Sequence, residues 1–291
     1  MSEILPFISV LMTAYNREKY IAEAIESVLS STYKNFELII IDDCSTDETY
    51  KVASLYASKD RRIKLCKNEQ NLGQFANRNK AIGISSGTYV KFVDSDDRIM
   101  PEGLELMGRA MQRFPDAGIG VAVTENVDNI PYTLPPHDSL SLHYKGNNHL
   151  CYGPTGAIFK KDILVNVGLF EEQYGILADT LLNMKIACVS PTVFFQKNLF
   201  FWRRHDDQVT EEQKDNVRMI RERHNILQAV MTYEYLPLDK KEITFIRNNF
   251  TKINTMHFFR YLYNGKIKNA FQVKKDTGLT VLKLLQAILK K

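Results

Sequence analysis

The sequence predicts an α/β fold, with a mostly parallel sheet flanked by helices and a helical C-terminal extension. The first hundred residues alternate short apolar runs with stretches whose apolar residues recur at helical spacing. The connections between these segments are short, and strand–helix–strand units of this kind form parallel sheets. From Thr210 the periodicity is helical almost to the last residue. Ligands of parallel sheets bind at the carboxyl ends of the strands, so functional residues are expected there.

The first third of the chain supplies four strands and the helices between them. The run 36–41 is apolar almost throughout, which predicts burial on both faces of the sheet. Ser45, with Glu48 three residues later, matches a capping box and predicts a helix start. The strands are expected at residues 7–12, 36–41, 63–67 and 89–93, and two of the helices at 19–31 and 75–85.

The middle of the chain has a mixed pattern. A stretch rich in Pro, His and Asn, residues 128–149, reads as a long loop, and loops of this length usually serve as lids or binding segments. Around it we expect a helix at 102–114 and strands at 119–124 and 193–202. The helical C-terminal region breaks near Pro237, Gly265 and Gly278. The chain therefore divides into residues 1–101, 102–209 and 210–291.

Composition is that of an ordinary soluble globule, with 44% hydrophobic and 25% charged residues. The net charge of +4 is unevenly placed, because residues from Lys240 onward carry 12 Lys and Arg against 2 acidic side chains, a balance of +10. The preceding residues carry 26 basic and 32 acidic side chains, or −6. The basic region could attract anionic lipid or an acidic acceptor, or it could consist of solvated helix faces. No nucleic-acid partner is expected.

The N-terminus lacks the basic start and apolar stretch of a signal peptide, and no run approaches the roughly 18 apolar residues of a spanning helix. The four cysteines are widely spaced, without a C-x-x-C pair, which indicates neither a zinc site nor a disulfide framework. We therefore expect a reduced, cytoplasmic protein. The last helix has an apolar stripe beside lysines, so it could contact the inner face of the membrane, or it could pack on the preceding helices or on another subunit.

The tetrad Asp94-Ser95-Asp96-Asp97 follows the buried strand at 89–93 and precedes a helix. Carboxylates crowded at a strand end repel one another and resist desolvation, and a cation relieves both costs. Carboxylate oxygens suit Mg²⁺ or Mn²⁺, which usually stays partly hydrated and completes its shell with phosphates. The tetrad therefore indicates a metal-held diphosphate, against the alternative of a solvated turn that caps the next helix.

Two more polar clusters end neighbouring strands, at Thr13-Ala14-Tyr15-Asn16 and at Asp42-Asp43. The sequence contains neither G-x-G-x-x-G nor a Walker lysine motif, so side chains and a metal must hold a nucleotide. Asp43 could accept from a base or ribose, or serve a turn. Arg78 could pair with phosphate or base, or lie in solvent.

These motifs, with Asn71-Leu72-Gly73 between them, resemble the donor half of the family 2 glycosyltransferases, inverting enzymes of the GT-A (Rossmann-like) fold. The resemblance covers residues 6–101 strongly and continues more weakly to about 210. It implies that residues 1–101 bind a nucleotide-sugar and 102–209 form the acceptor side of the same domain.

The resemblance also assigns roles to single residues. The segment Thr13, Ala14, Tyr15 and Asn16 would line the donor site together with Asp43, and Arg78 would lie near. Asp94 and Asp96 match the D-x-D motif that holds Mn²⁺ or Mg²⁺, with Asp96 the first choice for direct ligation. Asp97 would support the turn or reach a sugar hydroxyl.

The catalytic base of this family lies on a helix after a G-x-F-D/E segment, which Gly168-Leu169-Phe170-Glu171-Glu172 matches. The usual acidic pair reads Ala178-Asp179, so Asp179 takes the position of the base and its acidic neighbour is missing. An N-cap aspartate would look the same in sequence. Glu171 and Glu172 are fallback candidates.

Trp202-Arg203-Arg204-His205 resembles the family's Tyr-Arg-x-His segment, in which His205 would ligate the metal or contact phosphate. The Q-x-x-R-W motif of processive synthases is absent, which favours transfer of one sugar. UDP is the usual carrier in the family, and the expected acceptor is a saccharide or a lipid-linked sugar.

Two other functions stay open. A degenerate homologue that binds a nucleotide-sugar without turnover is suggested by Ala178 alone. A sugar-phosphate nucleotidyltransferase would carry a Gly-rich loop with Arg and Lys after the first strand, which Ala14-Tyr15-Asn16-Arg17 does not provide.

Overall fold

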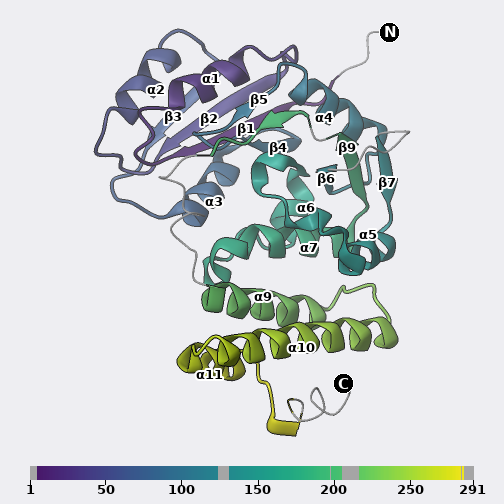
Figure 1. The fold of residues 1–291 in the computed structure, drawn as a ribbon. Helices are drawn as coiled ribbons and strands as arrows, with labels where there is room; N and C mark the ends of the chain where they lie inside the picture. The colour runs from purple at the N-terminus through teal and green to yellow at the C-terminus, as the bar shows by residue number, and fades with distance from the viewer. Residues whose placement is uncertain (1–4, 124–130, 197, 205–215, 283, 285–291) are drawn as a thin grey trace. The chain divides into compact units, whose positions relative to one another are not determined.

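The computed structural model describes residues 5–123, 131–196, 198–204, 216–282 and 284. The chain divides into two compact units (Figure 1). The first comprises residues 1–173 and 178–205, and the second 174–177 and 206–291. The motifs predicted from the sequence all belong to the first unit, and of their residues His205 falls outside the described part of the chain.

An eight-stranded sheet, in the order β3-β2-β1-β4-β8-β6-β9-β7, forms the centre of the first unit. Strands β1 to β4 pair in parallel, as do β6 and β9, whereas β8 and β7 run antiparallel to their neighbours. The strands are β1 (Ile8–Ala14), β2 (Phe36–Asp42), β3 (Ile63–Lys67), β4 (Tyr89–Phe92), β6 (Ile119–Val123), β7 (Tyr132–Leu134), β8 (Ala157–Lys160) and β9 (Thr192–Gln196). A small second sheet pairs β5 (Arg98–Ile99) with β10 (Phe200–Phe201).

Helices cover both faces of the sheet, with α1, α2 and α4 on one side and α3, α6 and α7 on the other (Figure 1). Their bounds are α1 (Ile21–Leu29), α2 (Thr49–Ala57), α3 (Gln74–Ile84), α4 (Gly103–Arg113), α5 (Pro136–Leu142), α6 (Lys161–Asn166) and α7 (Ala178–Val189). Every residue of β2 is buried, as its continuous apolar run predicts. The core under α1 and α4 joins one face of β1 and β2 to apolar helix residues such as Ile25 and Met107.

The predicted mostly parallel sheet with flanking helices is confirmed. β1 extends two residues beyond the strand predicted at 7–12, so Thr13 and Ala14 form its carboxyl end. The helix predicted to start at Ser45 begins at Thr49, whose N–H donates to Asp47 (3.0 Å), so no capping box forms at Ser45. Ser45 instead accepts the backbone N–H of Asn16 (3.0 Å). The Ser45 hydroxyl therefore joins the loop after β2 to the loop after β1. The local sequence around Ser45 cannot reveal this distant partner.

The segment predicted as a long loop is largely ordered where the structure describes it. Residues 131–149 contain β7, α5 and an irregular helical turn, η1 (His143–Asn147). Buried polar groups hold this segment, because Ser139 donates to Thr192 (3.0 Å) and contacts His149 (3.2 Å). Burial lowers the pKa of His149 to about 4, so this histidine is a neutral core residue. Pro, His and Asn are typical of loops, but here tertiary packing overrides that preference.

In the described part of the second unit, α9 (Asn216–Met231), α10 (Lys240–Tyr263) and α11 (Ile267–Asp276) pack on one another. The breaks predicted near Pro237, Gly265 and Gly278 are confirmed. Of the last apolar stripe, Leu279 and Leu284 pack against Phe258, and residues 285–291 lie outside the described part. In the residues that the structure covers, no helix is both long and apolar enough to cross a bilayer.

Candidate active site

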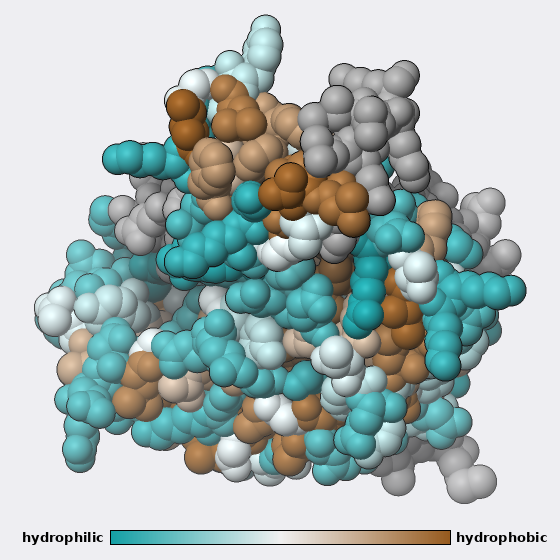
Figure 2. Space-filling view, turned by 90° about the horizontal axis from the view of Figure 1, so that it is seen from below, coloured by the Kyte–Doolittle hydropathy of each residue, from teal (hydrophilic) through white to brown (hydrophobic). Residues whose placement is uncertain are grey.

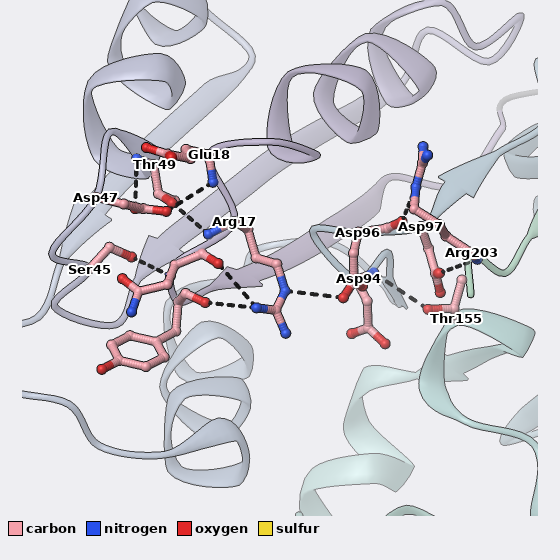
Figure 3. Close-up of polar contacts among 12 residues, drawn as sticks. Arg17, Glu18, Ser45, Asp47, Thr49, Asp94, Asp96, Asp97, Thr155 and Arg203 are labelled. Carbon is pink, nitrogen blue, oxygen red and sulfur yellow. Dashed lines mark hydrogen bonds and ion pairs between the residues drawn. The ribbon is translucent and has the colours of Figure 1, made fainter. Parts of the chain in front are cut away.

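The carboxyl ends of β1, β2 and β4 bring the three predicted polar clusters to one edge of the sheet. Ala14 pairs with Asp42 in register, and the N–H of Asp43 donates to the carbonyl of Ala14 (2.8 Å). On the other side of β1, the N–H of Val93 donates to the carbonyl of Leu11 (3.0 Å). The segments that follow these strands therefore begin side by side (Figure 3).

The loop after β1 is held to the loop after β2 by Asn16. Its backbone has a φ of 51°, a left-handed conformation that Asn tolerates better than most residues. Its side-chain oxygen accepts the N–H of Thr46 (3.0 Å). Tyr15, the preceding residue, is 45% exposed, so its ring is available to a ligand. Thr13 and Ala14 lie within β1, so Tyr15 and Asn16 are the exposed residues of this motif.

Asp43 is buried and organises the turn that leads into α3. Its carboxylate accepts from the side-chain amide of Asn68 (2.6 Å) and from the backbone N–H groups of Leu72 (2.9 Å) and Gly73 (3.0 Å). Gly73 has a φ of 83°, which a residue with a Cβ rarely adopts. Asp43 thus serves the turn in this structure, and a base or ribose would share an oxygen that is already hydrogen-bonded.

Arginines from three separate segments contact the tetrad in the described part of the chain, and two of them form ion pairs with its carboxylates. Arg78 of α3 pairs with Asp94 (2.7 Å), and Arg17 pairs with Asp96 (3.1 Å). Arg203 donates its backbone N–H to Asp97 (3.0 Å) and its Nε to the carbonyl of Asp96 (3.0 Å). The sequence indicated Arg78 as a partner of phosphate or base and did not indicate Arg17, since an arginine after Asn16 carries no local signal of pairing with a residue 79 positions later.

Asp97 points inward rather than toward solvent. Burial, followed by the neighbouring charge of Asp94, raises its pKa to about 7, although the Arg203 N–H and the Thr155 hydroxyl oppose this shift. Beneath it, burial lowers the pKa of Lys91 to about 7, and its ammonium donates to the carbonyls of Thr155 and Ala157. Asp97, the last residue of the tetrad, and Lys91 are therefore buried and lie away from solvent.

The G-x-F-E segment fixes the start of α7 relative to the tetrad. Phe170 packs on Phe75 of α3 (ring centroids 5.8 Å apart) and on Phe92 of β4 (5.6 Å). Asn79 hydrogen-bonds both the N–H (3.1 Å) and the carbonyl (2.9 Å) of Phe170. These contacts tie the segment before α7 to the helix and the strand that carry Arg78 and Asp94.

Asp179, the second residue of α7, has the properties of a tuned carboxylate. Burial raises its pKa to about 6, while the charge of Arg78 opposes the shift and that of Asp94 adds to it. Both charges act on Asp179, so the predicted base and the D-x-D motif belong to one electrostatic cluster. Both of its hydrogen bonds with Thr180 reach Oδ1, and Oδ2 faces Gly153, where an added Cβ would lie 3.8 Å away.

The fallback candidates Glu171 and Glu172 lie differently. Glu171 pairs with Lys185 and accepts from Gln173 (3.0 Å), whereas Glu172 is exposed.

The donor set fits a hard divalent cation. No group of three or more His, Cys, Asp and Glu side chains in the described residues is arranged to hold a metal alone. Asp94 and Asp96 supply carboxylate oxygens that are already paired with cations, at 31% and 14% side-chain exposure. An ion bound there would need further ligands, which water and a diphosphate supply.

A family comparison agrees with this arrangement, because residues 9–168 match Glycosyl transferase family 2. The chain belongs to glycosyl transferase family 2. The uncharacterized glycosyltransferase MJ1057 of Methanocaldococcus jannaschii is 41% identical over 38% of this chain and 39% of its own length. Glycosyltransferase GlyG of Streptococcus pneumoniae is 27% identical over 74% of this chain and 75% of GlyG. The putative teichuronic acid biosynthesis glycosyltransferase TuaG of Bacillus subtilis is 40% identical over 36% of this chain and 42% of TuaG.

This family 2 chain spans about two fifths of the length of MJ1057 and TuaG. Among solved structures, TarS 1-349 of S. aureus in complex with UDP-GlcNAc has a TM-score of 0.69 at 20% identity, over 97% of this chain and 81% of that one. The mannosyltransferase PcManGT of Pyrobaculum calidifontis, in complex with GDP-Man and Mn²⁺, has a TM-score of 0.66 at 16% identity, over 99% and 79%. These likenesses confirm the GT-A fold.

We predict that Asp179→Asn raises stability at neutral pH. A carboxyl whose native pKa lies above its unfolded value binds its proton more tightly when folded, so the charged form destabilises the native state above about pH 6. The variant removes that cost and keeps an oxygen for Thr180. Urea unfolding should show a gain of about 1–2 kcal/mol near neutral pH that vanishes as the pH falls to about 4.

The control for this measurement is Glu172→Gln, which removes the same charge from an exposed neighbour and should change stability little at either pH. An equal or lower stability of Asp179→Asn near pH 7 would show that Asp179 is an ordinary helix cap.

Proposed function

We propose that this protein is an inverting, divalent-metal-dependent glycosyltransferase. It moves one sugar from a nucleotide-diphosphate sugar, with UDP as the first choice of carrier, to a hydroxyl group on a saccharide or lipid-linked acceptor in surface polysaccharide or glycolipid synthesis. The observation that carries the proposal is the partly buried carboxylate of Asp179, with a pKa of about 6, in electrostatic contact with Arg78 and Asp94. A general base is most effective when its pKa lies close to the working pH.

Inverting transfer is one in-line displacement at the anomeric carbon. Oδ2 of Asp179 accepts the proton of the acceptor hydroxyl while the hydroxyl oxygen bonds to that carbon and the bond to the diphosphate breaks. Arg78 holds Asp94 in place and adds positive charge on the leaving-group side. Bound at Asp94 and Asp96, Mn²⁺ or Mg²⁺ supplies charge stabilisation to the departing diphosphate, which needs no protonation.

The donor side of the proposal has further support. Tyr15 offers an exposed ring for stacking on a nucleobase, and Asp43 lies buried in the adjacent turn. The solved neighbours were determined with UDP-GlcNAc and with GDP-Man and Mn²⁺, which supports a nucleotide-sugar donor and a divalent metal for this chain. TuaG supports a role in polysaccharide synthesis. His205 stays a proposed metal ligand, in the segment after Arg203.

Thermal shift measurements with UDP, GDP, dTDP, CMP and ADP, each with Mn²⁺ and with EDTA, test the donor site. One nucleotide should stabilise the protein in a metal-dependent way, by about 2.7 kcal/mol at 100 times its dissociation constant. Asp96→Ala should abolish the metal-dependent part. A shift with ADP alone, or one that ignores EDTA, would contradict the metal-held diphosphate.

The rate of transfer tests Asp179 itself. Asp179→Asn should lower kcat by about 10²–10⁴ while nucleotide affinity stays nearly the same, because the base acts only on the acceptor. In the wild-type protein the rate should fall with acid below about pH 6, where Asp179 takes up a proton. Full activity of Asp179→Asn would refute the base, and nucleotide binding without turnover by the wild type would favour the degenerate binder.

We propose in addition that α10 and α11 contact an anionic membrane surface at the inner face of the membrane. Residues 240–282 carry 9 basic and 2 acidic side chains, a balance of +7. Phe245 and Met256, 59% and 62% exposed, lie on one face of α10, since 11 residues make about three turns. Figure 2 shows hydrophobic side chains beside hydrophilic ones on the face that it displays. Apolar side chains among lysines favour lipid over nucleic acid as the anionic partner.

Sedimentation with vesicles tests this contact. The protein should bind vesicles that contain phosphatidylglycerol and not pure phosphatidylcholine, and about 0.5 M salt should release it. The double variant Phe245→Ser, Met256→Ser should bind about tenfold less. Leu55→Ser removes an equally exposed apolar side chain from α2 and should bind normally. Binding that is independent of lipid charge would contradict the proposal.

A further inference from the structure

Arg17 lies in the loop after β1 and pairs with a carboxylate of the tetrad, which follows β4. Its Nε donates to Oδ2 of Asp96 (3.1 Å), and the pair is mostly buried, at 18% and 14% side-chain exposure. Its Nη1 donates to the backbone carbonyls of Asn16 (3.1 Å) and Tyr15 (3.3 Å). The guanidinium is therefore braced by its own loop while it holds Asp96 (Figure 3).

The fold of this loop rests on other contacts. The backbone N–H of Arg17 donates to the hydroxyl of Thr49 (2.7 Å), and that of Glu18 donates to Asp47 (3.1 Å). Asn16 bonds Ser45 and Thr46 in addition. Backbone groups and neighbouring side chains thus fasten the loop in addition to the Arg17 side chain. The further contribution of Arg17 is a positive charge on Asp96.

The positive charge of Arg17 competes with a metal ion for the carboxylate of Asp96. A guanidinium and a divalent cation bind the same carboxylate oxygens and repel each other. We propose that Arg17 is a resident counter-ion of Asp96 that a divalent cation must displace, and that the displaced guanidinium pairs with the donor's diphosphate. This inference rests on the proposed function and makes Arg17 a positioning residue of that site.

The exchange predicts that metal and diphosphate bind cooperatively. A metal that binds alone breaks the Arg17–Asp96 pair and leaves Arg17 beside a second cation. A diphosphate supplies the lost partner, because guanidinium groups bind phosphate through charge-assisted hydrogen bonds. Each ligand therefore lowers the cost of binding the other, and couplings of this kind typically change affinity by roughly 5–150-fold. The acidic cluster would stay neutralised before, during and after donor release.

Mn²⁺ binding without nucleotide is the direct test. Electron paramagnetic resonance of free Mn²⁺ gives the affinity of the full chain for the metal alone. Arg17→Gln, which removes the competing charge, should bind Mn²⁺ about fivefold tighter than wild type. Arg17→Lys keeps a charge without the planar fork and should lie between the two.

The matched control is Arg98→Gln. Arg98 lies on β5, directly after the tetrad, and pairs with Glu23 (2.7 Å) rather than with a tetrad carboxylate. The Arg98→Gln substitution removes the same charge from the same region, so it measures the general effect of net charge on Mn²⁺ affinity. A gain in Arg98→Gln equal to that in Arg17→Gln would overturn the exchange, as would an unchanged or weaker Mn²⁺ affinity in Arg17→Gln.

Calorimetric titration of UDP and of GDP, with and without Mn²⁺, completes the cycle. The factor by which Mn²⁺ strengthens nucleotide binding should be at least fivefold smaller in Arg17→Gln than in wild type. An undiminished factor would overturn the phosphate half of the inference. If neither nucleotide binds any of the proteins while Arg17→Gln still binds Mn²⁺ tighter, the proposed UDP or GDP donor fails and the competition at Asp96 stands.

Discussion

Concentrated negative charge at one sheet edge is the constraint on which the rest of the site depends. The ends of parallel strands place Asp94, Asp96 and Asp97 together beside the buried strand β4, where water alone cannot offset their repulsion. The chain answers with Arg17, Arg78 and Arg203, which come from a loop after β1, from α3 and from the segment after β10. Segments far apart in sequence are thus fixed to one another by the charges that a metal and a diphosphate would also use.

Features encoded locally could be predicted from the sequence. The mostly apolar run of β2, the order of strands and helices up to β4 and the placement of Asp179 at a helix start all follow from patterns of a few residues. The order of the motifs along the chain also predicted where the site lies, because parallel strands place their carboxyl ends at the same edge of the sheet. These are the features that burial and backbone geometry determine without reference to distant partners.

What could not be predicted depends on distant partners. Ser45 and Glu48 match a capping box, yet the Ser45 hydroxyl accepts the backbone N–H of Asn16, and α2 begins only at Thr49, whose N–H donates to Asp47. Residues 131–149 have loop-like composition, but packing of α5 orders them. Arg17 and Thr155 carry no local signal, because their roles are set by residues more than 60 positions away. The roles of the site residues themselves stay predictions that the experiments above address.

Asp97 and Asp179 both have raised pKa values, but their surroundings suit them to different roles. Burial is the main cause for both, and it makes each costly to ionise. Asp97 recovers part of that cost through the Arg203 N–H and the Thr155 hydroxyl, contacts that turn it inward. Asp179 receives its hydrogen bonds from Thr180 on Oδ1, while Oδ2 faces the bare backbone of Gly153. A base must keep one oxygen for the proton it will accept, and of these two residues only Asp179 is arranged to do so.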